Sequence, residues 1–138
     1  MYPRNRFGAI GAVLISVGVL AGATAAPARA ATQVPAAGSI LCSGAYLCLQ
    51  TVSVNTTNHT AQVNAWANTK ALPGYFILDS PPDSQGISEG LNSPTQTWPA
   101  GGMHHTFTIE LLHGTYYMSA VWGSTNTIVG SKGFGINF

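Results

Sequence analysis

Charged side chains are scarce in this sequence: 7% of its 138 residues are Asp, Glu, Lys or Arg, against about 25% in an ordinary soluble domain. A nucleic-acid-binding domain carries a clustered positive field, which five Lys and Arg residues cannot build. The same scarcity excludes a long acidic or basic tail. Two cysteines are too few for a disulfide-dense mini-protein. We therefore expect a single, weakly charged domain with no nucleic-acid partner.

The first thirty residues have the pattern of an export signal. Two arginines precede an uncharged stretch from Phe7 to Ala28, which ends at Ala28-Arg29-Ala30. A positive start, an apolar core and an A-x-A exit are typical of a secretory signal peptide. We predict a signal peptide over residues 1–30 and a secreted or cell-surface location. The alternative is an uncleaved membrane anchor, because the uncharged stretch just reaches the roughly 20 residues that span a bilayer.

Removal of this segment would change the charge of the working chain. The formal net charge of +1 includes three arginines of residues 1–30. Residues 31–138 retain two lysines and four carboxylates, which give a formal net charge of −2. We expect residues 31–39 to be a flexible lead-in and residues 40–138 to form one domain, without membrane contact after cleavage.

Short β-strands are expected throughout this domain. No window places apolar residues at helical spacing over a charged face, whereas alternation with a period of two recurs. Residues 47–54 are predicted to form a strand with Cys48, Gln50, Val52 and Val54 on one face. Residues 79–94 are rich in Pro and Gly, which predicts a long functional or covering loop. The turn signals between these runs predict an all-β antiparallel sandwich of about seven strands.

One segment resembles a known family. Residues 107–118 contain alternating apolar side chains followed by Gly114-Thr115-Tyr116. This is similar to the E-to-F corner of immunoglobulin-like and fibronectin-like domains, where a tyrosine hydroxyl bonds to upstream backbone. The resemblance implies an immunoglobulin-like sandwich, with Tyr116 as the corner tyrosine and Met118 at the position of the second core cysteine. The family's inter-sheet disulfide is then not expected. In overall style the chain also resembles small secreted actinobacterial proteins of uncharacterised function.

Cys42 and Cys48 are the only cysteines of the chain. An even number of cysteines in an exported protein predicts a disulfide, and closing so short a loop contributes about 2 kcal/mol. A structural clasp is one interpretation of this loop. The alternatives are free thiols or a constrained recognition loop with Tyr46 and Leu47 at its tip, as in a protease inhibitor.

Metal and catalytic sites are not expected. Four histidines are present, but neighbours such as His104 and His105 point to opposite faces of a strand. These two are expected to be surface residues at a strand start. The G-x-S-x-G match at residues 86–90 lies in a Pro- and Gly-rich loop without the helix that a hydrolase nucleophile requires. We therefore predict a protein without enzymatic activity, cofactor or metal, and an enzyme is a lesser alternative.

Three aromatic residues are candidates for ligand binding. Trp66 shares a strand face with amide side chains, Tyr117 is expected to point outward, and Trp98 lies near the long loop. Exposed rings beside polar groups suit stacking on sugars or contact with a protein partner. The alternative is a core role, since tryptophan is mostly buried. We expect a secreted binding module for a polysaccharide or cell-surface polymer, and the alternatives are a protease inhibitor acting through its Cys42–Cys48 loop or a coat or filament subunit associating through strand edges.

Overall fold

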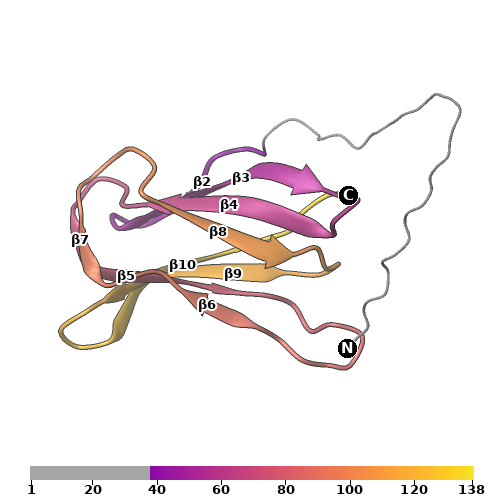
Figure 1. Ribbon diagram of the computed structural model, residues 1–138. Helices are drawn as coiled ribbons and strands as arrows, with labels where there is room; N and C mark the ends of the chain where they lie inside the picture. The colour runs from indigo at the N-terminus through magenta and orange to yellow at the C-terminus, as the bar shows by residue number, and fades with distance from the viewer. Residues whose placement is uncertain (1–37) are drawn as a thin grey trace, which may run out of the picture. The chain divides into compact units, whose positions relative to one another are not determined.

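Two antiparallel sheets pack face to face in this protein (Figure 1). The computed structural model describes residues 38–138. The four-stranded sheet has the order β2–β3–β4–β8, with bounds β2 Leu41–Ser43, β3 Leu47–Asn55, β4 Thr60–Trp66 and β8 His105–Glu110. The five-stranded sheet has the order β10–β9–β5–β6, and β7 also pairs with β5; its bounds are β5 Leu72–Asp79, β6 Gly90–Asn92, β7 Gln96–Trp98, β9 Tyr116–Trp122 and β10 Thr127–Phe134. The predicted all-β sandwich is confirmed, with nine strands in the described residues instead of about seven.

The core lies between the inner faces of the two sheets. Buried and exposed residues alternate most clearly in β8, where Phe107 and Ile109 face inward and Thr106, Thr108 and Glu110 are exposed. Each fully buried large apolar side chain contributes about 1.5–3 kcal/mol relative to an exposed one. The inward-facing core residues include Leu47, Leu49, Val63, Leu72, Phe76, Leu78, Phe107, Ile109, Tyr116 and Met118.

Strand β3 contains an irregularity that strict alternation did not predict. Its register with β4 shifts between Thr51 and Ser53, which marks a β-bulge. The extra residue, Val52, is 36% exposed, whereas Val54 is 5% exposed. The expectation that Cys48, Val52 and Val54 share one face is therefore wrong, because the bulge reverses the alternation within the strand.

Tyr116 ties the corner between β8 and β9 in the way that the Gly-x-Tyr pattern predicts. Its hydroxyl donates to the Glu110 carbonyl at 2.8 Å and accepts from the Leu112 N–H at 2.6 Å. Burial raises the pKa of this hydroxyl, which keeps it protonated as a donor. The Tyr116 ring stacks on Phe134 with centroids 5.5 Å apart, and Met118 is fully buried two residues later. The corner thus joins the two sheets through backbone hydrogen bonds and core packing.

The segment predicted to be one long loop, residues 79–94, is largely a β-hairpin. Strand β6 within it pairs with the end of β5, so the prediction missed a strand. The connecting loop is closed by the Ser80 N–H, which donates to the Glu89 carbonyl at 2.8 Å. Its tip is organised by Asp83, whose carboxylate accepts from the N–H groups of Gln85 and Ile87 at 2.8 and 2.9 Å. The side chain of Asp83 therefore serves as a turn former.

The features predicted for the N-terminal region fall mostly outside the described residues. The predicted signal peptide over residues 1–30 and most of the predicted lead-in over residues 31–39 lie there. In the part of the chain that the structure describes, no helix is long and apolar enough to cross a membrane. At the start of that part, the Gly38 N–H donates to the Thr51 carbonyl at 2.9 Å, so the lead-in is anchored beside β3 by residue 38.

Candidate binding face

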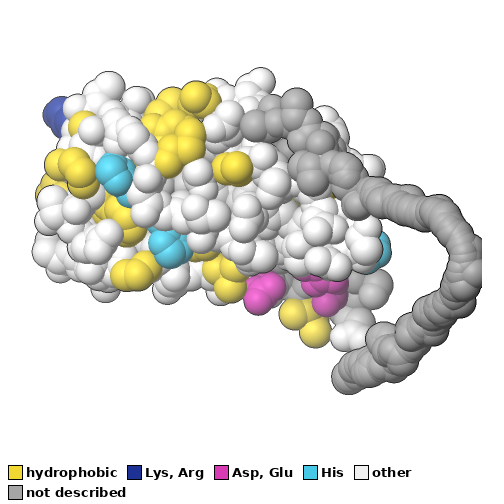
Figure 2. All heavy atoms as spheres, turned by 45° about the horizontal axis from the view of Figure 1, so that its top comes forward, with side chains coloured by type: hydrophobic (Ala, Val, Ile, Leu, Met, Phe, Trp, Pro, Cys, Tyr) yellow, Lys and Arg dark blue, Asp and Glu magenta, His cyan; other side chains and the backbone are white. Residues whose placement is uncertain are grey.

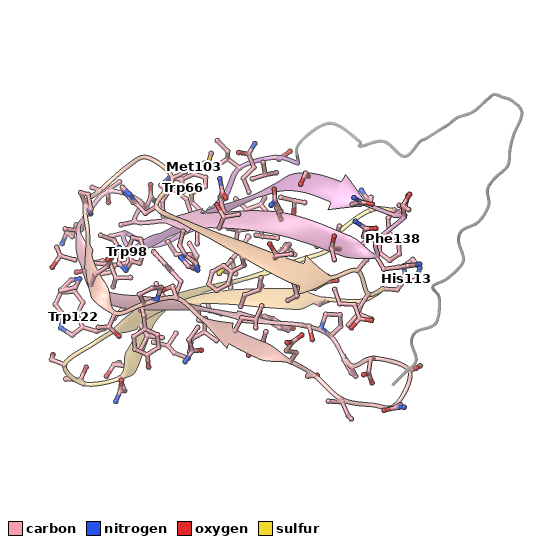
Figure 3. All side chains as sticks on the ribbon, in the orientation of Figure 1. Trp66, Trp98, Met103, His113, Trp122 and Phe138 are labelled. Atoms are coloured by element: carbon pink, nitrogen blue, oxygen red, sulfur yellow. A yellow bond between two sulfur atoms is a disulfide. The ribbon has the colours of Figure 1, made fainter. Side chains whose placement is uncertain are left out.

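Trp66 points to the outer side of the four-stranded sheet but is only 7% exposed. It lies directly opposite Cys48 in register, which places the Cys42–Cys48 disulfide beside the indole. Met103 lies next to Trp66 on the same side (Figure 3), and its sulfur accepts from the Asn64 side-chain amide at 2.9 Å. The prediction that Trp66 offers a free stacking surface is therefore wrong, because the disulfide and Met103 cover it.

Trp98 is a core residue. It is 2% exposed and lies 5.3 Å from Phe76 between ring centroids. Its indole N–H donates to the Gly74 carbonyl at 3.0 Å, which satisfies its one polar group inside the protein. Trp98 therefore has no face available for a ligand, and its predicted binding role is not supported by its position.

Tyr117 is the one predicted binding residue with an open ring. It is 52% exposed on the outer side of the five-stranded sheet, opposite in direction to the buried Tyr116. A Cβ atom placed on Gly133 would lie 3.1 Å from Tyr117 Cε1. The ring therefore rests on the bare backbone of β10, which supports one side of the ring and leaves the other side to solvent.

A row of four residues crosses the sheet at this point, and we call it the Tyr117 row. It consists of Gly133 of β10, Tyr117 of β9, Asp79 of β5 and Gly90 of β6, each opposite the next in register. Residues opposite each other in an antiparallel pair project to the same face. Asp79 is exposed, and a Cβ atom placed on Gly90 would lie 2.9 Å from its Oδ1. The two glycines thus leave an aromatic ring and a carboxylate as the only side chains of the row.

Polar groups lie in the next row along the same face. Ser119 of β9 is opposite Ser131 of β10 and Ile77 of β5, and Ile77 is opposite Asn92 of β6. The two serine hydroxyls are 3.2 Å apart. Rows that are two residues apart along a strand are separated by about 6.6 Å. The exposed Ser131 hydroxyl therefore lies on the strand next to Tyr117, the exposed Asn92 amide lies two strands away on β6, and Ser119 is 5% exposed.

This face combines the groups that bind a hydroxylated ring. An aromatic ring offers a flat apolar surface for stacking, and a carboxylate accepts two hydrogen bonds from neighbouring hydroxyls. The exposed Ser131 and Asn92 side chains can both donate and accept. No deep pocket is needed for such a ligand, because an extended polymer can lie along an open sheet face.

The Cys42–Cys48 disulfide is present and joins residues that are opposite each other on β2 and β3. The loop that it closes is attached to the rest of the domain. The Ala45 carbonyl accepts from the N–H groups of Thr69 and Lys70 at 2.9 and 3.0 Å, and Tyr46 packs edge-on against Trp122 at 5.4 Å. Leu47 is 0% exposed. The expectation that Leu47 lies at the tip of a recognition loop is wrong, because this side chain belongs to the core.

His104 and His105 lie against the same core residue, although they were expected to diverge on the surface. Their ring centroids are 5.8 and 6.1 Å from that of Trp98. His104 precedes β8 and its Nε2 lies 2.6 Å from the Gly101 carbonyl, so loop geometry turns it inward. Burial lowers the pKa of His105. Across residues 38–138, no group of three His, Cys, Asp or Glu side chains is placed to hold a metal ion.

Comparison with known proteins adds no family: no protein-family model, curated protein or solved structure matches this chain. The site therefore has to be interpreted from its own geometry. Sequence reasoning found Tyr117 but missed Asp79, Gly90 and Gly133 as its neighbours. Only the register between strands brings these residues next to Tyr117, and the alternation of residues within one strand does not reveal that register.

Proposed function

We propose that this protein is a secreted, non-enzymatic module that binds a neutral polysaccharide or similar cell-surface polymer across the Tyr117 row. The observation that carries the proposal is the exposed Tyr117 ring beside the Asp79 carboxylate, between two glycines. The disulfide supports an extracytoplasmic location, where such bonds persist. Sparse charge in the sequence favours a neutral ligand over an acidic one. The side of the four-stranded sheet, which Figure 2 turns toward the viewer, likewise shows few charged side chains.

We also propose that the sandwich is of the immunoglobulin-like or fibronectin-like type. The orders β3–β4–β8 and β10–β9–β5 correspond to strands A, B and E of one sheet and G, F and C of the other. The Tyr116 hydroxyl at the corner before β9 supports the same assignment. Met118 replaces the core cysteine of immunoglobulins, so only the fold is assigned. The function rests on the site, because this architecture hosts many functions.

The test is retention on insoluble polymers. The protein as its host produces it is incubated with cellulose, chitin and peptidoglycan, and the bound fraction is measured. We expect retention on at least one polymer and a loss of about tenfold in affinity for Tyr117→Ala, because the ring contributes about 0.5–1.5 kcal/mol of stacking in addition to the apolar area that it buries. Retention on none of the three, or undiminished retention of Tyr117→Ala, would overturn the proposal.

Two further variants locate the effect on the sheet face. Gly133→Ala places a methyl group 3.1 Å from the Tyr117 ring, so we expect it to tilt the ring and weaken binding without removing any contact group. Ile128→Ala is the matched control, because Ile128 is 58% exposed at the other end of β10, five residues from Gly133. This control is expected to bind like the wild type.

The inhibitor alternative has less support. Its loop would need to protrude, whereas Ala45, Tyr46 and Leu47 are bonded to or packed against the domain. Inhibition of an extracellular protease that is lost on reduction would favour it over the polymer-binding proposal.

A further inference from the structure

Strand β8 is an edge strand whose outer backbone groups are free in the described residues. It pairs with β4 alone. The Leu111 N–H donates to the His59 carbonyl at 2.9 Å, which fixes the phase of the ladder. Residues in an antiparallel strand alternate between bonding to one neighbour and bonding to the other. Ile109 and Phe107 therefore bond to β4, and Thr106, Thr108 and Glu110 direct their N–H groups away from it.

The direction of Glu110 is supported by an independent contact. Its carbonyl accepts from the Tyr116 hydroxyl at 2.8 Å, on the side away from β4. Thr106 and Thr108 keep both their N–H and their carbonyl groups unpaired within residues 38–138. Such a row of backbone groups is a template for another strand.

The other edges are protected, which makes β8 distinctive. Strand β10 has a bulge after Ile128, and Lys132 on it is paired with the inward-facing Met118, so a charged side chain is directed inward at this edge. Bulges and inward charges are devices that prevent edge-to-edge pairing. Strands β2, β6 and β7 have only three residues each. Strand β8 has six residues, no proline and no glycine, and its exposed side chains include two threonines.

We infer that a second copy of this chain pairs with this edge, β8 against β8, in a closed two-fold dimer. In the antiparallel register centred on Phe107, Thr106 of each copy lies opposite Thr108 of the other. That register uses all the free backbone groups of both threonines, and cross-strand threonine pairs are favourable. Glu110 then lies opposite His104 of the other copy, so no like charges meet. We assign a second copy as the partner because, in this register, the free backbone groups of both threonines find partners on an identical strand and Glu110 does not meet another carboxylate.

The same geometry favours a dimer over a filament. An open filament needs two complementary surfaces on each copy, whereas a two-fold contact uses one surface and closes. Since the remaining edges are protected, growth stops at two chains. The contact is a single strand edge, so we expect it to be weak and concentration-dependent.

Sedimentation velocity over a rising concentration series tests this inference. We expect the mean mass to rise from one chain to two and to stop there. Thr108→Pro removes the free N–H without touching the bonds to β4, an exchange that edge strands tolerate, and should remain a monomer. Thr108→Val keeps the N–H and is expected to dimerise like the wild type.

A second variant keeps the test decisive if the proline variant fails to fold. Thr106→Lys combined with Thr108→Lys places lysines opposite lysines in the proposed register and should also abolish the dimer. Amide exchange adds a local reading: the Thr106 and Thr108 N–H groups should become protected only in concentrated solution. A monomer at every concentration, growth beyond two chains, or association unchanged by both variants would overturn the inference.

Discussion

The outer faces of the two sheets each carry an aromatic side chain that points away from the core, but only one of them is open. Trp66 on the four-stranded sheet is 7% exposed, and Tyr117 on the five-stranded sheet is 52% exposed. The cross-strand neighbours differ. Trp66 faces the disulfide-bonded Cys48 and lies next to Met103 (Figure 3), whereas Tyr117 faces Gly133 and Asp79.

This contrast separates direction from exposure. Strand alternation decides to which side of a sheet a residue points. Whether the side chain then reaches solvent depends on the bulk of the residues opposite it and on loops that fold over it. A glycine neighbour supports the ring and leaves it open, whereas a disulfide and a methionine bury it.

The largest expected effect comes from removing the covered ring. Trp66→Ala should reduce the free energy of unfolding by about 3–5 kcal/mol, because it leaves a cavity under Met103 and beside the disulfide. Tyr117→Ala should change it by about 1 kcal/mol or less, as for other exposed sites. Urea unfolding followed by circular dichroism measures both. Equal losses in the two variants would contradict the contrast between the faces.

A smaller effect is expected from removing part of the cover. Cys42→Ser combined with Cys48→Ser should cost about 2 kcal/mol, because the disulfide closes a short loop. It should also admit water to the Trp66 indole, which acrylamide quenching of tryptophan fluorescence detects. Polymer binding at the Tyr117 row should be unchanged at temperatures where the variant is folded. Lost binding in the folded variant would mean that the two faces are not independent.

The smallest effect is a pH dependence from the region between the sheets. Burial beside Trp98 and Phe107 holds the pKa of His105 below the usual histidine value of about 6.5. Between these two pKa values the unfolded chain binds more protons than the folded one, so stability rises with pH. His105 therefore does not reduce the free energy of unfolding above about pH 6.5, and it reduces this free energy progressively as the pH falls below that value.

Urea midpoints at about pH 8 and about pH 5 measure this effect. His105→Gln should reduce the difference between the two midpoints, because it removes the titrating group and keeps a polar side chain of similar reach. His113→Gln is a suitable control, since His113 is exposed and stacks only on Phe138 near the chain end. An unchanged difference in His105→Gln would show that other groups cause the pH dependence.

Much of the fold was predictable because its signals are local. Alternating residues in β8 predicted its inner face, and Gly-x-Tyr predicted the corner at Tyr116. The bulge at Val52 was not predictable, because it depends on how β3 meets β4. Strand β6 was hidden because Gly90 and its two neighbours have no strand pattern of their own and are ordered by pairing with β5.

The candidate site was predictable only in part, for the same reason. The outward direction of Tyr117 followed from its place beside Tyr116. Its partners could not be found, since Asp79 and Gly133 lie far from it in sequence and meet it only through strand register. The roles expected of Trp66 and Trp98 failed because burial by distant residues leaves no mark on a single strand.

The sequence by itself determined that this chain is weakly charged, that its strands alternate, that Cys42 and Cys48 can pair and that Tyr116 forms a corner. These properties depend on composition and on residues close together in the chain. The tertiary structure alone decided which outward-facing ring is open, which residues surround it and which sheet edge is unprotected. Those properties depend on register between strands, and register is set by the packing of whole sheets over one core.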